Sequence, residues 1–201
     1  MSGDVTDLVE AHLREHLSGE PQRASVTFLG VEPIDVLLFA EPVGAGVQAT
    51  YASVGCSRHP MSDPLDIHAD PEAGPRAEVL IRLTVSGPMR GLHRSLATIA
   101  AAPSVEGLVL GADALIDLGE PLWDGSVFTA VVLADLEGPD LELPDLDLPG
   151  RAEPVHFLRA IPITANEAAW VRLKGVDALR VAWAEAGIDI NDPQRAAGTP
   201  S

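Results

Sequence analysis

Runs of hydrophobic residues alternate with turn-forming residues along this chain and mark most of its expected secondary structure. Runs rich in β-branched, aromatic and aliphatic residues predict strands. The predicted strands are 24–29, 34–40, 47–54, 76–85, 128–133 and 155–161, with short apolar segments at 108–110 and 115–118. The run at 34–40 is continuous enough to be buried on both faces. The glycine turn at 44–46 predicts that it forms a hairpin with 47–54.

Helical spacing predicts three helices. The first is capped by Asp4 or Thr6, and the second runs over 89–102 and ends at Pro103. The third begins at Thr164, because a Thr and a Glu three residues later form a capping box, and it ends before Gly187. Gly175 is expected to loosen or bend it. The apolar positions that predict its buried face are Ala169, Leu173, Val176, Leu179 and Trp183.

The uneven mixture of helices and strands predicts an α+β fold with a mixed, largely antiparallel sheet flanked by helices. A chain of 201 residues is the size of one domain. We expect a helix over 1–20 packed on a domain that spans 21–190, followed by a flexible tail over 191–201.

The net charge of the chain limits the classes of partner that it is expected to bind. There are 30 acidic and 13 basic residues, a formal net charge of −17. Nucleic acids and anionic membranes attract basic surfaces, so both are disfavoured, whereas a basic protein partner is favoured. The acidic N-terminus is unlike a signal peptide, and no run has the length of a transmembrane helix. Cys56 is the only cysteine, which excludes an internal disulfide and is compatible with the cytoplasm.

Candidate catalytic chemistry is sparse. Cys56, with His59, Asp66, His68 and Asp70, is the best nucleophile or metal-ligand set, and it defines an alternative function: a metal-dependent or cysteine hydrolase that uses the 56–70 loop. Its spacing matches neither a calcium loop nor a zinc motif, and ordinary loops are rich in such residues. The glycines at 44–49 resemble a dinucleotide-binding turn, but no helix follows them. We therefore expect no catalytic residue, no cofactor and no metal.

Two stretches carry a family resemblance when they are taken together. One reads G-x-S-x-x-P-M from Gly55 to Met61, ahead of the glutamate-bearing strand at 76–85, and the other is P-I-T-x-x-E from Pro162 to Glu167. Their order along the chain resembles the suppressor-of-fused (SUFU-like) domain family over 34–187. A Gly-His-Thr type loop of that family is absent, because the corresponding region, 111–116, reads GADALI.

The resemblance implies a non-enzymatic, SUFU-like domain that binds proteins. Eukaryotic relatives hold a short peptide, partly as an added strand, and many bacterial relatives resemble immunity proteins that neutralise a toxin domain. We therefore predict a bacterial immunity-type or regulatory protein, whose partner is a basic toxin domain or a regulatory protein. The acid-and-leucine stretch at 138–150 is expected to be a solvated excursion or edge strand, with a contact surface as the alternative. The candidate partner-binding residues are Arg58, His59, Met61, Asp140, Glu142, Asp145 and Asp147.

Overall fold

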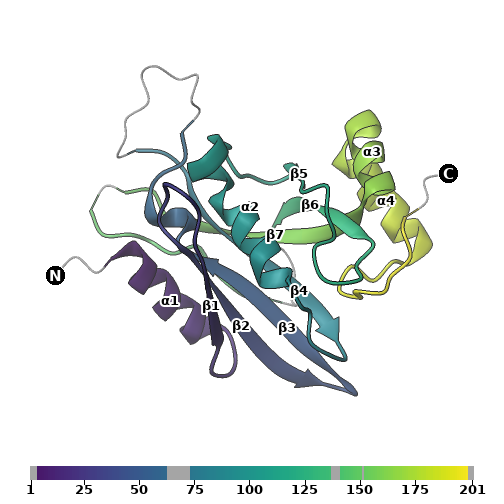
Figure 1. Cartoon of the computed structure of the whole chain (residues 1–201), viewed down its shortest axis with the longest axis horizontal. Coiled ribbons are helices and arrows are strands. Elements are labelled where there is room, and N and C mark those ends of the chain that lie inside the picture. Colours follow the sequence, from purple (N-terminus) through teal and green to yellow (C-terminus); the bar gives the residue numbers. More distant parts are fainter. Residues whose placement is uncertain (1–3, 63–72, 137–140, 151, 199–201) are drawn as a thin grey trace.

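A mixed seven-stranded sheet dominates the part of the chain that the structure, a computed structural model, describes: residues 4–62, 73–136, 141–150 and 152–198. Its strands lie in the order β1-β2-β3-β4-β7-β6-β5 (Figure 1). Among the strands of the described residues, only β4 and β7 pair in parallel. The strands are β1 (Gln22–Val26), β2 (Ile34–Val43), β3 (Gly46–Val54), β4 (Arg76–Val85), β5 (Leu115–Asp117), β6 (Phe128–Asp135) and β7 (Val155–Thr164). The predicted α+β class with a largely antiparallel sheet is confirmed.

Helices cover both faces of this sheet. Successive side chains of a strand point to opposite faces, so each face presents apolar side chains for a helix to cover. On β7, Leu158 and Ala160 pack with α2 on one face. Phe157 and Ile161 point to the other face, where the first packs with α1 and the second with α3 and α4. Figure 1 shows α1 and the α3–α4 pair at opposite ends of the sheet. The helices are α1 (Val5–His16), α2 (Leu92–Glu106), α3 (Ala165–Lys174) and α4 (Val176–Ala186), with a 3₁₀ turn, η1, at Cys56–Arg58.

Several predicted element boundaries differ from those of the structure, and two of the differences concern particular residues. The first strand ends at Val26, and Leu29, which was assigned to it, lies fully exposed near a turn. Helix α2 continues through Pro103 and ends at Glu106, where Gly107 adopts a left-handed φ of 70°. The fixed φ of proline is close to helical, so the helix continues past Pro103, although the residue removes one main-chain hydrogen bond and its ring crowds the carbonyl four residues earlier.

The predicted third helix is in fact two helices. Gly175 has φ 84° and ψ 167°, a conformation that non-glycine residues rarely adopt, and it separates α3 from α4. The break changes the helical phase, so the predicted apolar face holds only beyond it. Ala169 and Leu173 are exposed, whereas Val176, Leu179 and Trp183 are buried. The buried face of α3 consists of Glu167, Ala168 and Val171.

This change of phase predicts different costs for two leucine substitutions. Leu173 is 79% exposed and Leu179 is fully buried. We expect Leu173→Ala to change the free energy of unfolding by less than about 0.5 kcal/mol. Leu179→Ala should lower it by about 2–5 kcal/mol, because it leaves a cavity in the core. Urea denaturation measures both values, and equal costs would contradict the break at Gly175.

Candidate functional site

A buried carboxylate holds the loop from Gly55 to Met61. Glu78, on β4, is 0% exposed and lies at the end of β3. Its Oε1 accepts hydrogen bonds from the Gly55 amide (2.9 Å), the Ser57 amide (3.0 Å) and the Ser57 hydroxyl (2.7 Å). The Ser53 hydroxyl donates to Oε2. Burial raises the pKa of Glu78, although all four hydrogen bonds act to lower it. The carboxyl therefore replaces the main-chain partners that this sharp turn cannot supply.

The rest of the loop is fixed by Arg76 and by the buried side chain of Met61. Arg76 Nη1 donates to the carbonyl oxygens of Ser57 (2.7 Å) and Arg58 (2.9 Å). Met61 is 3% exposed, and its sulfur accepts a hydrogen bond from the Leu110 amide (3.2 Å). The Gly-Ser-Pro-Met stretch is therefore a structural unit of the fold, and Met61 offers almost no surface to a partner.

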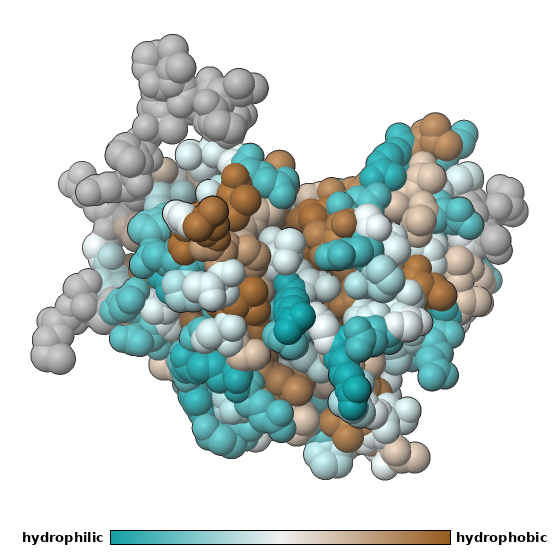
Figure 2. Space-filling model, in the orientation of Figure 1, coloured by the Kyte–Doolittle hydropathy of each residue, from teal (hydrophilic) through white to brown (hydrophobic). Residues whose placement is uncertain are grey.

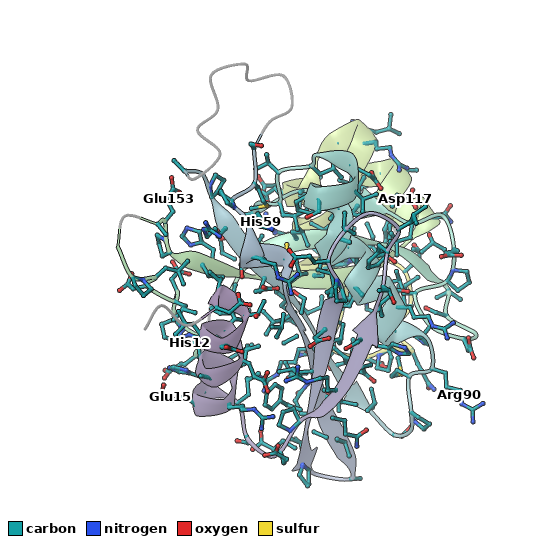
Figure 3. All side chains as sticks on the ribbon, turned by 60° about the vertical axis from the view of Figure 1, so that its left-hand side comes forward. His12, Glu15, His59, Arg90, Asp117 and Glu153 are labelled. Atoms are coloured by element: carbon teal, nitrogen blue, oxygen red, sulfur yellow. The ribbon has the colours of Figure 1, made fainter. Side chains whose placement is uncertain are left out.

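Arg58 and His59 do reach the surface, where they line a small cavity of about 210 Å³ beside the end of α2. His59 Nε2 lies 3.1 Å from Glu32 Oε2, and Arg58 Nε lies 3.7 Å from the same oxygen. Val105 and Leu108, at the end of α2, are exposed aliphatic side chains. Figure 2 shows hydrophobic patches among hydrophilic side chains on the face that carries α2, and Figure 3 labels His59. The rim of this cavity carries side chains of both charges, because Glu32 faces Arg58 and His59.

Cys56 is unsuited to nucleophilic chemistry. The residue is buried, and burial, with the nearby Glu78 carboxyl, raises the pKa of its thiol well above the ordinary value. A neutral, inaccessible thiol is a poor nucleophile. Asp66, His68 and Asp70, the other members of the candidate hydrolase set, lie outside the described residues. Within the described ranges, no three His, Cys, Asp or Glu side chains are grouped so that they could hold a metal ion.

In the stretch from 141 to 148, which we call the acidic row, the acidic side chains face solvent and the leucines face the domain. Leu143 is 7% exposed, and Leu141, Leu146 and Leu148 pack against the core under α1. Leu146 also pairs with Val155 through two main-chain hydrogen bonds. The side chains of Glu142, Asp145 and Asp147 are exposed, whereas Asp140 lies outside the described residues. The chain here presents carboxylates outward from an anchored backbone.

Two histidines hold this acidic row against the domain. His12, on α1, has its Nε2 2.7 Å from the Pro144 carbonyl oxygen, and its ring stacks on Phe157. His156 Nδ1 lies 2.7 Å from Asp145 Oδ2. Figure 3 shows His12 and Glu15 on α1. Asp145 is thus partly engaged, whereas Glu142 and Asp147 make no ion pair within the described part of the chain.

A second buried carboxylate, Glu167, was predicted only as the last member of a capping box. The box is present: Glu167 Oε2 accepts from the Thr164 amide at 2.8 Å, and the Glu167 amide donates to the Thr164 hydroxyl at 3.2 Å. Burial would raise the pKa of Glu167, but hydrogen bonds from Arg195, Thr164, Trp183 and Gly198 hold it below the ordinary value. Glu167 is 1% exposed, so it is a structural centre and has no access to a ligand.

Arg195 is the partner that the sequence pattern did not indicate. It is 6% exposed, and its guanidinium donates to both Glu167 oxygens, at 2.8 and 3.1 Å, and to the Pro162 carbonyl at 2.8 Å. It also lies over the rings of Phe128 and Trp183. Arg195 lies within 191–201, the segment that is expected to be a flexible tail, and these contacts join it to Glu167 and Pro162. Tail arginines are usually solvated, so no periodicity could have identified this one.

The structure therefore separates the predicted site residues into two surfaces. Arg58 and His59 share the cavity beside α2, whereas Glu142, Asp145 and Asp147 belong to the acidic row. Met61 belongs to neither surface. No helix among the described residues is long and apolar enough to cross a membrane.

Comparisons with known proteins give a consistent family. The model of the family described as Suppressor of fused protein (SUFU) matches residues 30–196. No curated protein matches the chain. A SUFU homologue from Neisseria gonorrhoeae is 20% identical, with a TM-score of 0.67 and coverage of 98% of this chain and 97% of that one.

Two further solved structures share the fold. A chain of the Sufu–Fu complex is 15% identical, with a TM-score of 0.65 over 96% of this chain and 90% of that one. Drosophila Suppressor of Fused is 16% identical, with a TM-score of 0.57 over 84% of this chain and 43% of that one.

Proposed function

This chain belongs to the suppressor of fused family, and on that premise we propose that it is a non-enzymatic protein that binds and neutralises a protein partner. A relative of the same fold was solved as a complex of Sufu with Fu, which supports protein binding as the activity. The buried, neutral thiol of Cys56 supports the non-enzymatic part of the proposal.

The observation that carries the proposal is the acidic row. Glu142, Asp145 and Asp147 project from a backbone that buried leucines anchor, so little conformational entropy is lost when a partner binds them. With a net charge of −17, the chain attracts basic surfaces over a distance of about one Debye length. The partner that fits best is a basic protein, and we propose a toxin domain or a regulatory protein of a bacterium. Arg58 and His59 form a second contact region.

Neutralising the acidic row is expected to weaken binding of a basic partner. We would prepare the variant Glu142→Gln/Asp145→Asn/Asp147→Asn and compare it with the wild-type chain in pull-downs from the native organism. Each contact that involves a charged group contributes about 1.5–3 kcal/mol when it is desolvated, so affinity should fall at least about tenfold. Raised salt should weaken the wild-type interaction in the same direction.

A matched control removes two exposed carboxylates elsewhere. Glu120 and Glu185 are exposed, and the double variant Glu120→Gln/Glu185→Gln should retain the partner. Equal capture by the wild-type and acidic-row variants, or capture that salt does not weaken, would refute the assignment of this surface.

A further inference from the structure

A groove lies on the sheet face between α1 and the segment that follows α4. One hollow of about 460 Å³ is lined by Arg82, Gln48 and the end of α1, and a second of about 180 Å³ adjoins it at Arg82 and Leu141. We call this the sheet-face groove. Its floor follows from the strand register, because Thr50 pairs with Arg82 and Leu80 pairs with Arg159 across neighbouring strands. The volume of the larger hollow lies within the range of about 300–1,000 Å³ that ligand sites have.

Two hydrogen-bond donors on this floor lack partners. Arg82 is half-buried, and its guanidinium makes no hydrogen bond or ion pair with any described residue. Gln48 Nε2 is buried without a partner, although Gln48 Oε1 lies 3.4 Å from the Thr84 hydroxyl. A buried donor without a partner, such as Gln48 Nε2, is uncommon in folded proteins and needs an explanation. A guanidinium beside a carboxamide suits a carboxylate, which accepts hydrogen bonds from both.

The rest of the groove rules out a simple anion. Glu15, Glu41 and Glu142, the last shared with the acidic row, line the larger hollow and are exposed, so they favour cationic side chains. Leu80 and Ile161 line the smaller hollow and suit an apolar side chain. We infer that the sheet-face groove binds a peptide segment in which one carboxylate, held by Arg82 and Gln48, is flanked by basic and aliphatic residues. This inference rests on the proposed function, since the segment belongs to the protein partner.

The test uses the full chain and two short labelled peptides. One alternates lysine and valine around a central aspartate, and the other carries asparagine in its place. We expect the wild-type chain to bind the aspartate peptide at least about tenfold more tightly by fluorescence anisotropy, because hydrogen bonds between charged groups are the strong ones. Arg82→Gln should abolish this preference and leave the affinity for the asparagine peptide unchanged. Glu15→Gln/Glu41→Gln should weaken both peptides equally.

Arg90→Gln is the matched control, because it removes the same charge from an exposed residue that lies well away from α1 in Figure 3. It should bind both peptides as the wild type does. Unfolding midpoints establish that each variant is folded. Equal binding of both peptides by the wild type, no binding of either peptide, or equal weakening of both by Arg82→Gln would overturn the inference. Loss of partner capture in the acidic-row variant would still support the proposed function in that event.

Discussion

Replacing Glu167 with Gln is expected to lower the free energy of unfolding by about 3–5 kcal/mol. The substitution leaves the Arg195 guanidinium buried without a counter-charge, and this is the situation in which a buried ion pair is costly to break. For a chain of this size, the melting temperature should fall by about 10 °C. Thermal and urea denaturation at neutral pH measure the effect.

The pH dependence of this effect has a defined sign. The folded protein holds the pKa of Glu167 below that of the unfolded chain. The stabilisation is therefore present above the unfolded pKa and is lost as the pH falls through the folded pKa. The difference between the wild-type and Glu167→Gln proteins should shrink in acid, where Glu167 itself becomes neutral. A difference that stays constant over this range would contradict the role of charge.

Truncating the chain tests whether the effect of Glu167→Gln comes from the ion pair with Arg195 or from the helix cap at Thr164. A chain that ends at residue 190 lacks Arg195 and the Gly198 amide, and it should lose stability on a scale similar to that of Glu167→Gln. A chain that ends at residue 198 keeps these contacts and should match the wild type. If removal of 191–201 had no effect, the segment would be the dispensable tail that its composition predicts.

Local signals in the sequence were enough for most of the fold. The sequence predicts the β4 strand and the capping box at Thr164 correctly, because a run of β-branched and aliphatic residues and the chemistry of a cap depend only on near neighbours. Gly175 is a weak point of the predicted helix, but the sequence does not determine whether a glycine bends a helix or ends it. The phase of α3 therefore could not be predicted.

The pattern of hydrophobic and polar residues does not predict polar contacts between residues that are far apart in the chain. Glu167 meets Arg195 28 residues later, and Glu78 meets Ser53 25 residues earlier. Nothing in the periodicity of either segment indicates these partners. Arg195 lies in a segment whose composition is that of a solvated tail, and Ser53 lies near the end of a strand. The same limit applies to the sheet-face groove, since Arg82 and Gln48 read as ordinary outward-facing positions of two strands.

Glu78→Ala should be at least as damaging as the loss of Glu167, with an expected decrease in the free energy of unfolding of about 3 kcal/mol or more. It removes the acceptor for two main-chain amides and two hydroxyl groups that are buried, and each donor left unsatisfied costs about 1–3 kcal/mol. The loop that presents Arg58 and His59 should loosen as well. Hydrogen exchange of the Gly55 and Ser57 amides, together with urea denaturation, measures both consequences.

Glu78→Gln is the matched variant, because it keeps the shape and one oxygen that can accept the three hydrogen bonds made by Oε1. The folded pKa of Glu78 is raised, so the contribution of its protonated form is full below the unfolded pKa and is lost as the pH rises through the folded pKa. The wild-type protein should therefore lose stability with rising pH relative to Glu78→Gln, the opposite trend to that at Glu167. Parallel pH profiles for the wild type and Glu78→Gln would contradict this expectation, because they would show that folding leaves the pKa of Glu78 unshifted, with its four hydrogen bonds offsetting the effect of burial.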